Sequence, residues 1–171
     1  MISKAGKRTG RFATAIALIA VCALASPSLA ATSSTTLTSG DVNGSIALSD
    51  AKAAPGSPLG VTVDLTVAPG WHIYGTKVSD EFIPTTLRFA PDHIAKQSWN
   101  FPPATPVNFE GLGETIPVYT GKFSVKATVV LAPNLKPGEY QLTGTLKFQE
   151  CNDNICKVPQ AATFSLPVTV Q

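Results

Sequence analysis

Apolar and polar residues alternate along several short stretches of the chain, which is the pattern of half-buried β-strands. In the stretch 61–67, four aliphatic residues alternate with threonine, aspartate and threonine. The stretches 85–89, 123–129, 142–148 and 163–170 repeat this alternation. The sequence therefore predicts a series of short strands, each with one face toward a core.

Turn-forming residues separate these stretches. Pro-Gly pairs occur at 55–56, 69–70 and 137–138, a Pro-Pro pair at 102–103, and Gly-Leu-Gly at 111–113. No stretch shows an apolar period of 3.6 residues, and fourteen prolines and thirteen glycines would interrupt most helices. We expect seven to nine short strands in an all-β, antiparallel β-sandwich that forms a single domain over residues 42–171.

The N-terminal segment carries the features of an export signal. Four basic residues precede an apolar run of 13 residues from Ala13 to Ala25, and Ser28-Leu29-Ala30 supplies a small-x-small cleavage pattern. The run is shorter than the roughly 20 residues needed to span a bilayer. We expect residues 1–30 to be a signal peptide cleaved after Ala30, so that the mature protein is periplasmic. Residues 31–41, rich in serine and threonine, are expected to be a flexible leader.

Removal of the signal changes the charge balance. The full chain has 13 basic and 11 acidic residues, and four of the basic ones lie before the apolar run. The mature part therefore keeps nine basic residues against eleven acidic ones. No basic stripe remains, so nucleic acid is not an expected partner.

Two cysteines remain in the mature chain, Cys151 and Cys156, separated by the turn-forming residues Asn-Asp-Asn-Ile. One strand pattern ends just before Cys151 and another begins after Pro159. Residues that face each other across such a hairpin lie about 4.5–5.5 Å apart at Cα, within reach of a disulfide. The exported compartment permits that bond.

Spacing and composition leave the role of this pair open. A staple across so short a loop stabilises a domain by only about 2 kcal/mol, and a chain of this length has a core of its own. Two interpretations of the pair therefore remain: a reversible redox couple, and a structural disulfide in a non-catalytic adaptor. Two thiolates with His72 or His93 could also bind Cu(I) or Zn(II), so a copper-handling protein is a third alternative.

Three stretches of the sequence resemble the N-terminal periplasmic domain of the thiol:disulfide interchange protein DsbD. They are the stretch 69–74 (PGWHIY), the pair formed by 101–103 (FPP) and 113–119 (GETIPVY), and the stretch 148–159 (FQECNDNICKVP). In order and spacing, the resemblance covers nearly the whole mature chain, from about Gly44 to Val170. The stretch with the cysteines is the most specific of the three.

The resemblance implies an immunoglobulin-like sandwich with a redox-active cysteine pair on a terminal hairpin. It implies that Cys156 forms the mixed disulfide with partners and that Cys151 resolves it. His72 and Tyr74 match family positions near the cysteines.

The resemblance also implies an aromatic or apolar cap over the pair, for which Phe109 and Leu112 are the candidates. From the local charges, Lys157 and His72 are expected to favour a thiolate, whereas Glu150 and Asp153 are expected to oppose it.

On these grounds the expected function is that of a protein-disulfide reductase module. The Cys151/Cys156 couple would relay reducing equivalents between periplasmic thioredoxin-fold or disulfide isomerase proteins, with no cofactor. The chain ends at Gln171 without a C-x-x-C motif or a further apolar span. We therefore expect a separate membrane protein as the electron donor, and a monomer.

Overall fold

The computed structural model of the protein describes Met1, residues 32–109 and residues 113–171. Apart from Met1, the predicted signal peptide and its cleavage site lie outside the described residues, as does Leu112. No helix among the described residues is long and apolar enough to cross a membrane.

The described residues form three sheets, with strand orders β1-β2-β4-β10-β7, β3-β13-β11-β6 and β12-β5-β9-β8. The strands are β1 (Ser34–Ser39), β2 (Val42–Leu48), β3 (Lys52–Ala53), β4 (Pro58–Val67), β5 (His72–Tyr74), β6 (Thr86–Phe89), β7 (Ile94–Asn100), β8 (Thr105–Asn108), β9 (Thr115–Tyr119), β10 (Lys122–Leu131), β11 (Gly138–Phe148), β12 (Glu150–Cys151) and β13 (Gln160–Val170). A short 3₁₀ helix spans Pro91–His93. Among the strands of the described residues, the pairings are antiparallel except for that of β13 with β3.

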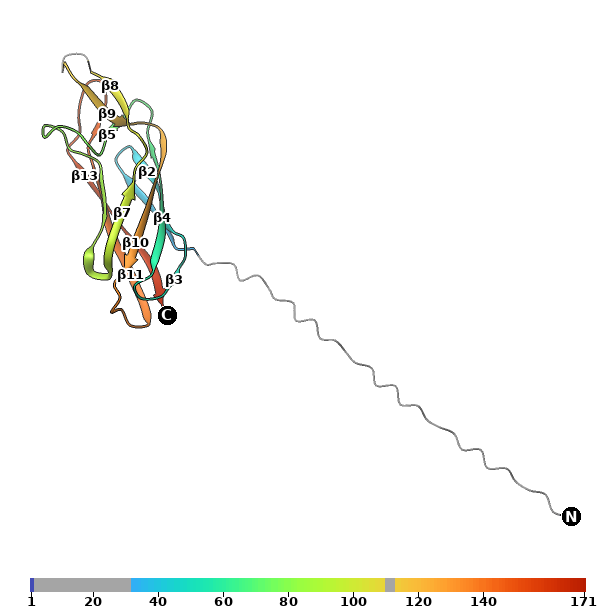
Figure 1. Cartoon of the computed structure of the whole chain (residues 1–171). Helices are drawn as coiled ribbons and strands as arrows, with labels where there is room; N and C mark the ends of the chain where they lie inside the picture. Colours follow the sequence, from blue (N-terminus) through green and yellow to red (C-terminus); the bar gives the residue numbers. More distant parts are fainter. Residues whose placement is uncertain (2–31, 110–112) are drawn as a thin grey trace.

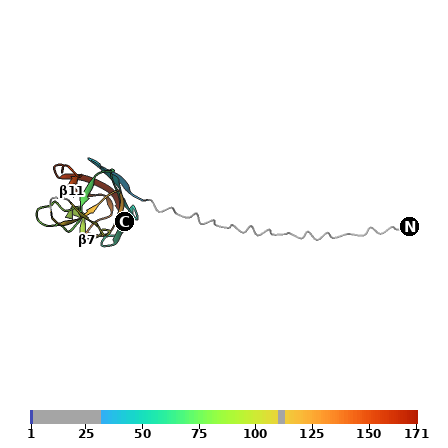
Figure 2. The same ribbon diagram turned by 90° about the horizontal axis from the view of Figure 1, so that it is seen from above.

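The two larger sheets bury a shared core between them, which makes the domain an immunoglobulin-like β-sandwich. The predicted alternation is confirmed along β4, where every second residue from Leu59 to Val67 is buried. The same pattern runs along β13, from Ala162 to Val170. Aliphatic and aromatic residues of both sheets belong to one buried cluster. Figure 2 shows the domain from above, with β7 and β11 labelled.

The third, smaller sheet lies at one end of the sandwich. Figure 1 shows β5, β8 and β9 at the end opposite the C-terminus. A separate small cluster of buried residues belongs to this sheet: Tyr74, Ile116, Val118 and Cys151. Cys151 therefore lies beside the main core and not inside it.

Two expectations need correction. The strands in the described residues outnumber the seven to nine expected, because β3, β5 and β12 are only two or three residues long and leave no alternating pattern, and because β1 lies in the expected leader. The expected flexible leader over residues 31–41 contains β1, which pairs along its whole length with β2 and buries Leu37. Threonine is a good strand former, so a composition typical of linkers also suits an edge strand.

Candidate functional site

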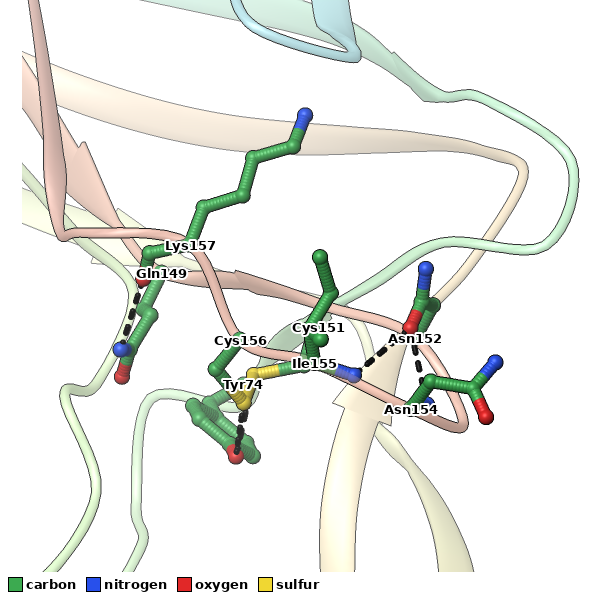
Figure 3. The surroundings of a disulfide bond; sticks show 8 residues. All are labelled: Tyr74, Gln149, Cys151, Asn152, Asn154, Ile155, Cys156 and Lys157. Carbon is green, nitrogen blue, oxygen red and sulfur yellow. Dashed lines mark hydrogen bonds between the residues drawn. A yellow bond between two sulfur atoms is a disulfide. The ribbon is translucent and has the colours of Figure 1, made fainter.

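The two cysteines close a short ribbon that continues the β11–β13 hairpin. Glu150 and Cys151 form β12, and Cys151 faces Cys156 in an isolated antiparallel bridge. The Asn152 side chain accepts hydrogen bonds from the backbone N–H groups of Asn154 and Ile155, both at 2.9 Å (Figure 3). The Asn152 N–H in turn donates to the carbonyl oxygen of Ile155 at 2.9 Å. The loop between the cysteines is thus held by its own first residue.

A disulfide joins Cys151 to Cys156, with 4.0 Å between their Cα atoms. The two cysteines differ in accessibility: Cys151 is only 2% exposed, whereas Cys156 belongs to the exposed side of the ribbon. Ile155 and Val158, which flank Cys156, are 58% and 75% exposed. A protein that approaches the pair therefore meets Cys156 first, within an apolar rim.

Tyr74 directs its hydroxyl group at both sulfurs. The Oη atom lies 3.2 Å from Cys151 Sγ and 3.5 Å from Cys156 Sγ (Figure 3). Burial raises the pKa of Tyr74, so the hydroxyl keeps its proton. Because the sulfurs of a disulfide carry no hydrogen, the hydroxyl is the donor. The same group can donate to a thiolate once the bond is reduced.

His72 lies on the same short strand and pairs with Cys151 across β5 and β12. It is 7% exposed. Burial lowers the pKa of His72, and the nearby Asp153 carboxylate opposes part of that shift. The imidazole is therefore mostly neutral at neutral pH, and the expected help of a cationic His72 to a thiolate is not supported.

Phe109, the first of the two candidate caps, follows β8 and packs on the small cluster that contains Cys151. Its ring centroid lies 4.9 Å from that of His72. A cleft of about 600 Å³ opens beside the disulfide, lined by His72, Tyr74, Val107, Asn108, Phe109 and the loop from Cys151 to Cys156. Phe109 forms one wall of this cleft.

An ion pair beside the cysteines was not anticipated from the sequence. The Glu150 carboxylate is fully buried and accepts a hydrogen bond from Lys157 Nζ at 2.8 Å. Lys157 also contacts the Asp41 carboxylate. Figure 3 shows the Lys157 side chain extending away from the sulfurs. Because the two charges are bound to each other, the structure does not support the expectation that Lys157 favours the thiolate and Glu150 opposes it. Their symmetric places outside the cysteine pair were the signal that could have revealed this.

The same residues offer little support for a metal site. No group of three or more histidine, cysteine, aspartate or glutamate side chains in the described parts of the chain is arranged to hold a metal ion. His93, the other histidine considered as a ligand, lies at the 3₁₀ helix with its ring centroid 5.0 Å from that of Tyr140.

Comparisons with known proteins agree with this geometry. The family described as "Thiol:disulfide interchange protein DsbD, N-terminal" matches residues 46–167. A search of curated proteins found no match.

The solved structures that are similar to the chain include two N-terminal domains. The N-terminal periplasmic domain of ScsB from Proteus mirabilis aligns with a TM-score of 0.56 at 14% identity, covering 81% of the chain and 51% of that domain. The Neisseria meningitidis DsbD N-terminal domain in its reduced form aligns with a TM-score of 0.41 at 16% identity, covering 82% of the chain and 90% of that domain. The chain thus spans about half the length of the ScsB domain.

Proposed function

The chain belongs to the DsbD N-terminal domain family of thiol:disulfide interchange proteins, and from that premise we propose that it relays reducing equivalents between proteins through the Cys151/Cys156 couple. The observation that carries the proposal is the asymmetry of the pair. Cys156 is exposed in an apolar rim, whereas Cys151 is buried and lies 3.2 Å from the Tyr74 hydroxyl. Exchange needs one reachable sulfur and one that stays behind to complete the reaction.

The chemistry follows from this arrangement. The Cys156 thiolate of the reduced protein attacks the disulfide of an oxidised partner, forms a mixed disulfide, and releases one partner thiolate. The Cys151 thiolate then attacks Cys156 Sγ, which closes the Cys151–Cys156 bond and releases the second partner thiolate. Two electrons pass from this domain to the partner. A donor dithiol returns the domain to its reduced form by the same steps in reverse.

The neighbouring side chains suit these steps. The Tyr74 hydroxyl can donate a hydrogen bond to the thiolate that forms at either sulfur. Phe109 packs on His72 beside the disulfide and would shield the couple between encounters, moving aside when a partner docks. Leu112, the alternative cap, follows Phe109 by three residues.

A purely structural disulfide is the competing function. The loop that it closes is short, and hydrogen bonds that the Asn152 side chain accepts from the Asn154 and Ile155 N–H groups already order that loop. The bond also lies in the small cluster at the end of the sandwich, outside the main core. A staple at this place would therefore stabilise little.

The compartment and the partners are part of the proposal. The related ScsB domain is periplasmic, and the N-terminal sequence has the features of a cleavable signal. Partners would be periplasmic thioredoxin-fold proteins or disulfide isomerases, with a separate membrane protein as the electron donor. The domain would act as a monomer without a cofactor.

Two measurements test the proposal. The mature protein is equilibrated in glutathione or dithiothreitol buffers, and its reduction potential is expected above about −300 mV, the range of exchange proteins. A potential below that value would indicate a permanent staple.

The second measurement assigns the two sulfurs. Cys151→Ala is expected to accumulate mixed disulfides with a thioredoxin-fold protein, whereas Cys156→Ala is expected to form none. The reverse pattern would exchange the two roles.

A further inference from the structure

Glu150 is a buried carboxylate whose two oxygens are both engaged. Oε1 accepts a hydrogen bond from the backbone N–H of Asp41 at 2.8 Å, and Oε2 accepts one from Lys157 Nζ at 2.8 Å. Hydrogen bonds to the carboxylates of Asp41 and Glu150 raise the pKa of Lys157. The Lys157 ammonium also lies 4.0 Å from the centroid of the Trp71 ring. The ion pair is therefore held on several sides.

The β1–β2 turn is shaped to receive this carboxylate. Gly40 has a φ of +59°, in the left-handed region that favours glycine. A Cβ atom at position 40 would lie 2.5 Å from both carboxylate oxygens of Glu150. Only glycine thus permits both the backbone conformation and the close approach, so the turn and the carboxylate are matched to each other.

The ion pair lies next to the disulfide along the ribbon. Glu150 directly precedes Cys151, and Lys157 directly follows Cys156. Their backbones are joined by a hydrogen bond from the Lys157 N–H to the Glu150 carbonyl oxygen at 2.8 Å. The ion pair therefore links the same two chain segments as the disulfide, one residue further from the loop. Reduction breaks the disulfide and leaves the ion pair in place.

We propose that the Glu150–Lys157 ion pair, anchored on the Gly40–Asp41 turn, holds the reduced ribbon closed and so positions Cys151 to resolve the mixed disulfide at Cys156. The inference rests on the proposed exchange function and deepens it. Glu150 and Lys157 act here as positioning residues, because neither needs to touch the reacting sulfurs. With the ribbon closed, the Cys151 thiolate competes with external thiols at a high effective concentration. With the ribbon open, the effective concentration of the Cys151 thiolate at Cys156 falls.

Oxidised glutathione is a suitable probe of this step. The Cys156 thiolate attacks oxidised glutathione, forms a mixed disulfide, and releases one glutathione thiolate. The Cys151 thiolate then attacks Cys156 Sγ, closes the protein disulfide, and releases the second glutathione. The ratio of closed to mixed disulfide at a fixed concentration of reduced glutathione measures the effective concentration of Cys151.

The principal variant is Glu150→Gln. It keeps the shape of the side chain and the hydrogen bond from the Asp41 N–H, but it removes the ion pair with Lys157. We expect the ratio of closed to mixed disulfide to fall about tenfold, which corresponds to a potential about 30 mV less negative for this two-electron couple. Asp41→Asn is the matched control. It removes a carboxylate from the same ammonium but leaves the Glu150–Lys157 link, so its ratio is expected to stay within about twofold of wild type.

A second pair of variants guards against failure of Glu150→Gln to fold. Gly40→Ala would displace the Glu150 carboxylate from its turn, whereas Gly121→Ala imposes a similar strain, at a φ of +57°, in open space. Both should lose thermal stability from the backbone strain, Gly40→Ala more so because of its clash with Glu150, but only Gly40→Ala should lower the ratio of closed to mixed disulfide.

The outcomes separate the two proposals. If wild type exchanges with glutathione while Glu150→Gln and Gly40→Ala keep its ratio, the positioning role is wrong and the exchange function stands. If the wild-type disulfide resists glutathione altogether, the exchange function itself fails, whatever the variants do.

Discussion

Reduction of the Cys151–Cys156 bond is the perturbation that most directly separates a redox couple from a structural staple. The bond joins residues only five apart in sequence. The chain-entropy relation gives about 2 kcal/mol of stabilisation for so short a loop. Because the main core cluster contains neither cysteine, we expect the sandwich to remain folded when the bond is broken.

Urea unfolding, followed by tryptophan fluorescence, measures this effect. With a slope of about 2 kcal/mol/M, a loss of about 2 kcal/mol lowers the midpoint by about 1 M on reduction. The double variant Cys151→Ala/Cys156→Ala is the control, and its midpoint should not respond to dithiothreitol. A loss above about 4 kcal/mol in the wild-type protein would refute the reasoning, because the fold would then depend on the bond.

Three substitutions test the side chains around the couple. Tyr74→Phe should raise the pKa of the thiol that ionises first by about one unit, since a hydrogen bond to a charged acceptor contributes at least about 1.5 kcal/mol. The ultraviolet absorbance of the thiolate measures that pKa, and Tyr140→Phe is the control. An unchanged thiol pKa in Tyr74→Phe would contradict the role of the Tyr74 hydroxyl as a donor to the thiolate. Phe109→Ala should speed the alkylation of the reduced protein by iodoacetamide, and an unchanged rate would exclude Phe109 as a cover. His72→Gln should lessen the loss of stability on acidification, measured by urea unfolding at several pH values. Burial lowers the pKa of His72, so the unfolded chain takes up a proton that the folded protein resists as the pH falls below 6.5, the ordinary histidine value. Equal acid sensitivity of wild type and variant would contradict this.

Alternation of apolar and polar residues was sufficient to predict the long strands of the sandwich. It worked for β4 and β13 because each has ten or eleven residues, with one face buried in the core. It failed for β5 and β12, since two or three residues have no measurable period. It failed for β1 because threonine and serine are typical both of linkers and of edge strands.

The candidate site was likewise predictable only in part. The cysteines and the turn between them were visible as local sequence, and the family resemblance supplied His72, Tyr74 and Phe109. The link from Glu150 to Asp41 was not predictable, because it joins residues 109 positions apart. Only the folded chain shows that the turn after β1 receives the carboxylate that precedes Cys151.

The energetics of this arrangement bear on how readily the bond can be reduced. Folding and disulfide formation are linked, so a bond that stabilises the fold by about 2 kcal/mol is itself stabilised by the fold to the same extent. For a two-electron couple that amount lowers the reduction potential by only about 40 mV relative to the same cysteines in an unfolded chain. The global fold therefore does not lock the bond. Local contacts must then set most of the difference between a closed and an open ribbon, which is why the Tyr74 hydroxyl and the Glu150–Lys157 ion pair are the groups whose removal should move the potential.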